Sequence, residues 1–287
     1  MSIRTTGKEK VSRRQGPRCQ GNSDLIDRIR RRVLLVDEHR PGDNTGVMTD
    51  IATQHGFTRE TLAVIASRHG GTGDGANRSR AFGEFEALPM PSPETEQWRY
   101  TDLRDFDLSF EPYAPRPWAD NLDQVDLGLL EAAGEIGDRA GLALQHNSST
   151  VLARTDPDVD RMGVHFESID DALRDHPELL EGKLHGTIPT ARTRFTALHG
   201  AFRTGGTFVQ VPANVKVELP LQTVTYVDHD GLAVFPHTLI VLEEGAELTF
   251  IDRYVSPDLK GVFSDAVVEI HAGAGSRIRL QIHSSHN

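Results

Sequence analysis

Among the 13 histidines, four in the strand-rich C-terminal region could bind a metal ion through neutral imidazole nitrogens: His229, His237, His271 and His283. A cupin site would need two histidines one residue apart, then a glutamate and a distant third histidine. The segment at 227–231 does not supply that pattern. We therefore expect solvated or hydrogen-bonded surface histidines and predict no metal ligand, with a metal-binding cupin-like module as one alternative.

Charged residues in the same region could serve acid–base catalysis if they gathered on one face. They are Glu218, Glu247, Asp252, Arg253, Asp265 and Glu269. Their scattered spacing predicts surface charges, so we assign no catalytic residue and leave the cofactor-binding residues unknown. A β-helix carbohydrate-active enzyme is the enzymatic alternative.

Acidic residues at Asp156, Asp158, Asp160 and Glu167 match the first, third, fifth and twelfth positions of a calcium-binding loop. Arg161 stands at the sixth position, where the sharp turn requires glycine. We therefore expect a solvated hairpin tip here.

The histidines and charged residues of the C-terminal region would be positioned by a series of short strands that begins after Gly205-Gly206. Apolar and polar residues alternate there, and β-branched residues are frequent, as is typical of strands. The predicted strands are 207–211, 215–219, 223–227, 239–242, 248–251, 267–270 and 278–282.

Small-residue corners recur between these strands at a spacing of roughly thirty residues, within the range of solenoid repeats. Few two-residue hairpin turns follow the strands. We therefore predict stacked coils with parallel pairing, which form a right-handed parallel β-helix. A jelly roll or cupin barrel is the competing architecture.

Helical patterns dominate the part of the chain before the strands. We expect helices at 58–69, capped by Thr58, and at 80–88, joined by a flexible linker at 71–76. Further helices are predicted at 168–176, where Ser168 and Asp171 form a capping box, at 177–184 and at 192–202, with strands near 142–153 and 163–166. The predicted organisation is a basic, disordered extension at 1–47, a helical or α+β region at 48–195 and the β-helix core at 196–287.

Composition narrows the function classes. The formal net charge is −11, although residues 1–40 carry an excess of six positive charges, so the folded body is acidic and we expect no nucleic-acid partner. Cys19 is the only cysteine, which fits a reducing cytoplasm and excludes an intrachain disulfide. No apolar run is long enough to cross a membrane, so we expect no membrane partner.

Trp98 and Tyr100 follow three alternating prolines at 89, 91 and 93. Buried aromatic residues mostly pack, so we expect both rings to pin this loop to the core. A surface that binds a partner is the alternative.

Three strings carry a family resemblance: Glu96-Gln97-Trp98-Arg99-Tyr100-Thr101 after Leu88-Pro89, the stretch from 205 to 222, and the stretch from 237 to 246. Together they resemble the SufB/SufD family of the SUF iron–sulfur cluster assembly system, and within it the SufD branch. The resemblance covers about residue 48 to the C-terminus.

The resemblance implies a right-handed β-helix and a complex with a SufB-like subunit and an ABC-type ATPase, SufC. It also implies a scaffold subunit that is not an enzyme by itself and that binds no cofactor stably alone, with the iron–sulfur cluster assembled on the complex. In the family the solenoid continues beyond this length to a Cys-Ser-His-Gly-like motif and a helical domain. We therefore expect a C-terminally truncated β-helix and transfer no cluster-site residue to this chain.

Overall fold

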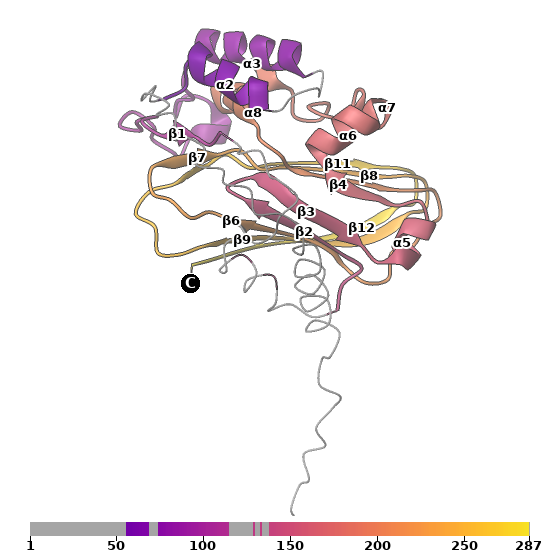
Figure 1. The fold of residues 1–287 in the computed structure, drawn as a ribbon. Helices are drawn as coiled ribbons and strands as arrows, with labels where there is room; N and C mark the ends of the chain where they lie inside the picture. Colours follow the sequence, from indigo (N-terminus) through magenta and orange to yellow (C-terminus); the bar gives the residue numbers. More distant parts are fainter. Residues whose placement is uncertain (1–55, 69–73, 115–128, 130–132, 134–137, 287) are drawn as a thin grey trace, which may run out of the picture.

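The computed structural model describes residues 56–68, 74–114, 129, 133 and 138–286, in which the strands form three sheets. The sheets have the orders β1-β7-β10, β11-β8-β5-β4 and β12-β9-β6-β2-β3. In Figure 1 the second and third sheets form an upper and a lower layer. The strands are β1 (Glu111–Pro112), β2 (Gly141–His146), β3 (Ser149–Thr155), β4 (His165–Ser168), β5 (Thr207–Val211), β6 (Leu221–Tyr226), β7 (Leu232–Val234), β8 (His237–Leu242), β9 (Glu247–Ser256), β10 (Phe263–Ser264), β11 (Val267–Ala272) and β12 (Arg277–His286).

Parallel pairing follows a thirty-residue repeat. Strand β10 pairs with β7, β11 with β8 and β12 with β9, and each residue lies beside the one thirty positions away. Because the same offset recurs in all three sheets, the segment β10-β11-β12 lies on the segment β7-β8-β9 along its length. The predicted parallel pairing and its period are therefore confirmed, and the described strands form no closed barrel.

The predicted strand at 215–219 is wrong. Only one isolated bridge forms there, between Lys216 and Glu247, after a corner in which Asn214 has a positive φ of 62°. Pro220 lacks an N–H group and cannot donate to a ladder, so regular pairing resumes only at Leu221.

Strands from both sides of residue 196 share the same sheets. β2 pairs in parallel with β6 and antiparallel with β3, while β4 pairs antiparallel with β5. β2 and β3 occupy the predicted range 142–153, with outer ends at 141 and 155, and β4 overlaps the predicted range 163–166 but ends at 168. The predicted domain boundary at 195/196 stays a prediction.

The helices cover one side of the sheets in Figure 1, apart from a short one at the end of the layers. They are α2 (Arg59–Arg68), α3 (Gly75–Ala87), α5 (Pro157–Arg161), α6 (Ile169–Asp175), α7 (Pro177–Leu180) and α8 (Arg194–Phe202), with 3₁₀ turns η1 (Glu96–Trp98) and η3 (Thr190–Arg192). Helices α2, α3 and α8 pack around an aromatic core that also contains Ala233 of β7 and Phe235, which directly follows β7. Phe202 is fully buried in this core, with ring centroids 5.2 Å from Phe57, 5.9 Å from Phe82 and 6.2 Å from Phe235.

Caps explain where several helices begin. The N–H of Thr61 donates to Oγ1 of Thr58 (3.1 Å), and the N–H of Asp171 donates to Oγ of Ser168 (3.0 Å), as predicted. α3 begins earlier than predicted. The helix starts at Gly75, so Gly75 and Ala76 of the predicted linker are helical, and the carboxylate of Asp74 pairs with Arg78 one turn later. Residues 71–73 of the linker lie outside the described residues.

The calcium-loop pattern at 156–167 has a different role. Asp156 accepts a hydrogen bond from the N–H of Asp158 (3.0 Å) and caps α5, with Pro157 at its first position. α5 connects β3 and β4, which belong to different sheets, so the predicted hairpin tip is wrong. A proline after an aspartate favours a helix start over a two-strand turn.

The two aromatic residues of the proline-rich segment differ in their surroundings. Trp98 packs on Phe195 with ring centroids 5.5 Å apart, as predicted, whereas Tyr100 is 94% exposed and does not pin the loop. Among the described residues, no helix has the length and apolarity needed to cross a bilayer. The predicted extension at 1–47 lies outside the described residues.

Candidate functional site

A buried group of three histidines and one glutamate lies where α8 meets the β8 sheet. We call His185, His199, His237 and Glu269 the histidine cluster. His199 comes from α8, His237 begins β8, Glu269 lies in β11, and His185 lies in the loop between α7 and η3. His199, His237 and Glu269 are fully buried, so each polar atom needs a partner within the protein.

A chain of hydrogen bonds connects the cluster. The Nδ1–H of His199 donates to the backbone carbonyl of Asp265 (2.8 Å), since a carbonyl oxygen only accepts. The Nε2 of His199 lies 3.0 Å from the Nδ1 of His237, and the Nε2 of His237 lies 3.1 Å from Oε2 of Glu269. The rings are therefore held in fixed orientations.

The loop around His185 encloses the carboxylate of Glu269. Oε2 accepts from the N–H of His185 (2.6 Å), and Oε1 accepts from the N–H groups of Thr187 and Ile188 (2.8 Å each). His185 has a positive φ of 58°, which is uncommon for a residue with a side chain. This conformation directs its N–H to Glu269 and keeps its ring 5.2 Å from that of His237, centroid to centroid.

Burial keeps these imidazoles neutral near pH 7. Burial lowers the pKa of His199 and of His237 well below the usual range, and neighbouring histidines add to the effect. Burial and the positive charge of Arg203 lower the pKa of His185 to about 4. A neutral imidazole has a free lone pair on one nitrogen, which is the form that binds metal ions.

Buried arginines lie beside the cluster. The fully buried Arg203 pairs with Asp74 (2.9 Å) and Asp170 (3.1 Å), and Arg78 pairs with Asp74 (3.3 Å). Together with Glu269, these groups carry two positive and three negative formal charges. The cluster and these neighbouring groups together therefore have a net formal charge of −1.

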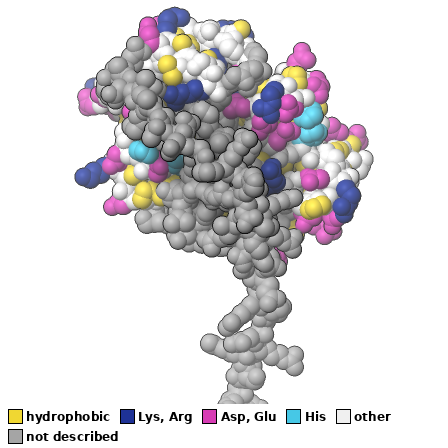
Figure 2. Space-filling model, in the orientation of Figure 1, with side chains coloured by type: hydrophobic (Ala, Val, Ile, Leu, Met, Phe, Trp, Pro, Cys, Tyr) yellow, Lys and Arg dark blue, Asp and Glu magenta, His cyan; other side chains and the backbone are white. Residues whose placement is uncertain are grey.

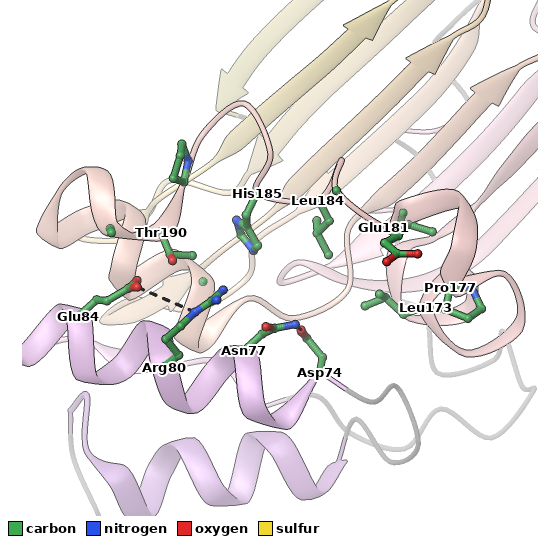
Figure 3. A pocket seen from close by; sticks show the side chains of 15 residues that line it. Asp74, Asn77, Arg80, Glu84, Leu173, Pro177, Glu181, Leu184, His185 and Thr190 are labelled. Carbon is green, nitrogen blue, oxygen red and sulfur yellow. Dashed lines mark hydrogen bonds and ion pairs between the residues drawn. The ribbon is translucent and has the colours of Figure 1, made fainter.

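A pocket of about 480 Å³ reaches the cluster at His185, and we call it the α3 pocket. In Figure 3, His185 and Thr190 lie across the pocket from Asp74, Asn77, Arg80 and Glu84, which come from the N-terminal end of α3 and the helix itself. Glu181 also lines it. The pocket connects the half-buried imidazole of His185 with solvent.

Two adjacent regions of the chain match models of one protein family. Residues 145–223 match the SufBD protein N-terminal region, and residues 225–286 match the SufBD core domain of the SUF system for iron–sulfur cluster assembly. The chain is thus similar to the SufBD family over these two regions. His185 and His199 lie in the first matched region, and His237 and Glu269 lie in the second.

Curated relatives carry the same family name. An iron–sulfur cluster assembly SufBD family protein of Staphylococcus saprophyticus is 26% identical over 254 residues, covering 79% of this chain and 53% of the relative. Proteins with that family name from Staphylococcus epidermidis and Staphylococcus haemolyticus are 29% and 28% identical, each covering 70% of this chain and 44% of the relative. The chain thus spans about half the length of the curated relatives it matches.

A second group of possible metal ligands lies nearer the protein surface. His165, Glu167 and His176 are half-buried, and their ligand atoms lie within 4.8 Å of one another. Figure 2 shows histidine atoms among acidic side chains in the region of α6 and α7. Half-buried side chains such as these stay hydrated more easily than the buried side chains of the histidine cluster.

The predicted surface location is wrong for some of the residues noted in the sequence. His237, Glu269 and Asp252 are buried, although we expected surface positions. Asp265 is half-buried, and its Oδ2 atom is buried without a hydrogen-bond partner. The alternation of β9 and β11 turns Asp252 and Glu269 inward, and His237 lies in β8, which is buried on both faces.

The remaining residues noted in the sequence do not meet in one place. His229 is exposed beside Asp228, His283 is exposed, and Nε2 of His271 lies 3.0 Å from the carbonyl of Lys183. Glu218 and Glu247 are not buried, Arg253 is half-buried, and Glu247 pairs with Lys216. The sequence analysis missed His185 and His199. A histidine on the apolar face of α8, next to Leu198 and Phe202, was the available signal for His199.

Proposed function

We propose that this chain is a SufD-like, non-catalytic scaffold subunit of a SUF iron–sulfur cluster assembly complex that acts in the cytoplasm. The observation that carries the proposal is the pair of adjacent family matches over residues 145–286, which coincide with the repeating sheets. The relatives' names refer to iron–sulfur cluster assembly, and the strings at 96–101 and 237–246 support the SufD branch.

We infer that the sheets are successive coils of a right-handed parallel β-helix. The support is the common thirty-residue offset in all three sheets, since a solenoid stacks each coil on its neighbour. Such a repeat offers long surfaces on which other proteins assemble.

The partners follow from the same proposal: a SufB-like subunit and a SufC-like ABC ATPase. Cys19 is the only cysteine of the 287 residues, so these residues offer at most one thiolate ligand to a cluster. We propose that any cluster is assembled on the complex. The comparisons support neither the carbohydrate-active enzyme nor the cupin-like module.

Co-purification tests this proposal. The tagged chain, and a version extended by any in-frame downstream sequence, are expressed with the SufB-like and SufC-like proteins of the same host. The expected result is that at least the extended version retains both partners, while a tagged, unrelated β-solenoid retains neither. If both versions melt cooperatively and neither binds a partner, the proposal is wrong.

A further inference from the structure

The hydrogen-bond directions in the histidine cluster bring two acceptors together. Because the Nδ1–H of His199 donates to the carbonyl of Asp265, the Nε2 of neutral His199 can only accept. Neutral His237 has one N–H for two neighbouring acceptors, the Nε2 of His199 at 3.0 Å and the carboxylate of Glu269. When that N–H is on Nδ1, it donates to His199. The Nε2 of neutral His237 then carries a lone pair. That lone pair faces Oε2 of Glu269 at 3.1 Å.

Two facing acceptors need a positively charged species between them, either an additional proton or a metal ion. Three backbone N–H groups already donate to the carboxylate of Glu269, which is an arrangement that stabilises a negative charge. A metal ion fits this pair of acceptors.

A third ligand lies at the same point. The available ligand atoms of His185, His237 and Glu269 all lie within 4.8 Å of one another. The 3.1 Å between His237 and Glu269 is close to the separation of about 3.3 Å between neighbouring ligands of a tetrahedral zinc ion. His185 belongs to a loop, so its ring can close the remaining distance by rotation of the side chain.

We propose that His185, His237 and Glu269 bind a divalent transition-metal ion that enters through the α3 pocket. Two imidazole nitrogens and one carboxylate suit Fe(II) and Zn(II). His199 acts as the positioning residue, because its hydrogen bonds to Asp265 and His237 fix the ring that presents Nε2. The proposal departs from the sequence-based expectation of no metal ligand, and it holds whether or not the chain works in the SUF system.

The charges around the site favour a cation. Asp74 and Asp170 neutralise Arg203, and Asp74 also contacts Arg78, which leaves Glu269 as the excess negative charge. Asp74, Glu84 and Glu181 outnumber Arg80 on the lining of the α3 pocket. A pocket lined by negative charge raises the local concentration of cations.

Metal affinity of the full chain, with any histidine tag removed, tests the proposal. Zn(II) and Co(II) are titrated against a chromophoric chelator, and the Co(II) spectrum reports nitrogen and oxygen ligation. We expect one tight equivalent, and His185→Asn should weaken it at least about tenfold. Asparagine tolerates the positive φ of His185, so this variant should keep the fold.

His176→Asn is the matched control, because it removes a histidine from the second group and leaves the histidine cluster intact. Its affinity should equal that of the wild type. In a second measurement on the wild type, the ¹⁵N signal of Nε2 of His237 should shift when Zn(II) is added. Absence of a tight equivalent, unchanged binding by His185→Asn, loss of binding in His176→Asn, or an unchanged His237 signal would each overturn the proposal.

Discussion

Asp252 gives a prediction whose size follows from its surroundings. Its side chain points from β9 into the interior and is 1% exposed. Oδ2 accepts hydrogen bonds from Oγ1 of Thr238 (3.2 Å) and from the hydroxyl of Tyr254 (3.1 Å), while buried Oδ1 has no partner among the described residues. Burial raises the pKa of Asp252 from its ordinary 3.8 to about 6, against the smaller opposing effect of these two hydrogen bonds.

The sign follows from proton linkage. The folded state holds the Asp252 proton up to a higher pH than the unfolded state, so the free energy of unfolding falls as the pH rises from 3.8 to about 6 and levels off above. Relative to acidic pH, where both states hold the proton, Asp252 lowers the free energy of unfolding by about 1 kcal/mol at pH 4.5 and by about 3 kcal/mol at pH 7.5. Asp252→Asn removes the charge and keeps the shape, so it should stabilise the protein by about these amounts at the two pH values.

Urea unfolding followed by circular dichroism at both pH values measures the difference. Asp258→Asn is the matched control, since Asp258 is exposed and its replacement should change stability by less than about 0.5 kcal/mol at either pH. Titration of other groups, including Asp265, cancels because wild type and variant share them. A stability difference between wild type and Asp252→Asn that does not grow with pH would refute the reasoning.

Two further predictions concern packing. Phe202→Ala should lower the free energy of unfolding by about 3–5 kcal/mol, because a fully buried ring of the aromatic core is lost. Tyr100→Ala, at a 94% exposed position, should change the free energy of unfolding little in the same calorimetric experiment. Similar losses for both variants would contradict this prediction. Gly206→Ala should destabilise the protein by more than Gly231→Ala does. Both glycines have a positive φ, but a Cβ at Gly206 would lie 2.5 Å from the carbonyl oxygen of His237, whereas Gly231 has open space, so equal urea midpoints would count against the described backbone.

Local patterns predicted much of the secondary structure. Alternating β-branched residues indicated six of the seven predicted strands, and small-residue corners indicated the thirty-residue repeat. Ser168 and Thr58 predicted helix starts because a cap satisfies backbone N–H groups within a few residues. The segment at 215–219 failed because its pairing depends on neighbouring coils and on Pro220.

The histidine cluster could not be predicted in this way. Its members are up to 84 residues apart, between His185 and Glu269, and come from a loop, a helix and two strands. Which face of β11 points inward depends on the sheet register, and a shift by one residue would turn Glu269 to the other face of the strand.

Residue types and their order along the chain thus determined the strands, the repeat and the caps, because those rest on contacts between near neighbours. The tertiary structure alone decided that a glutamate expected on the surface is enclosed by a loop and faces a buried imidazole. The physical reason is that burial and hydrogen-bond direction arise only when distant segments pack together, and they determine which lone pairs are free to bind a ligand.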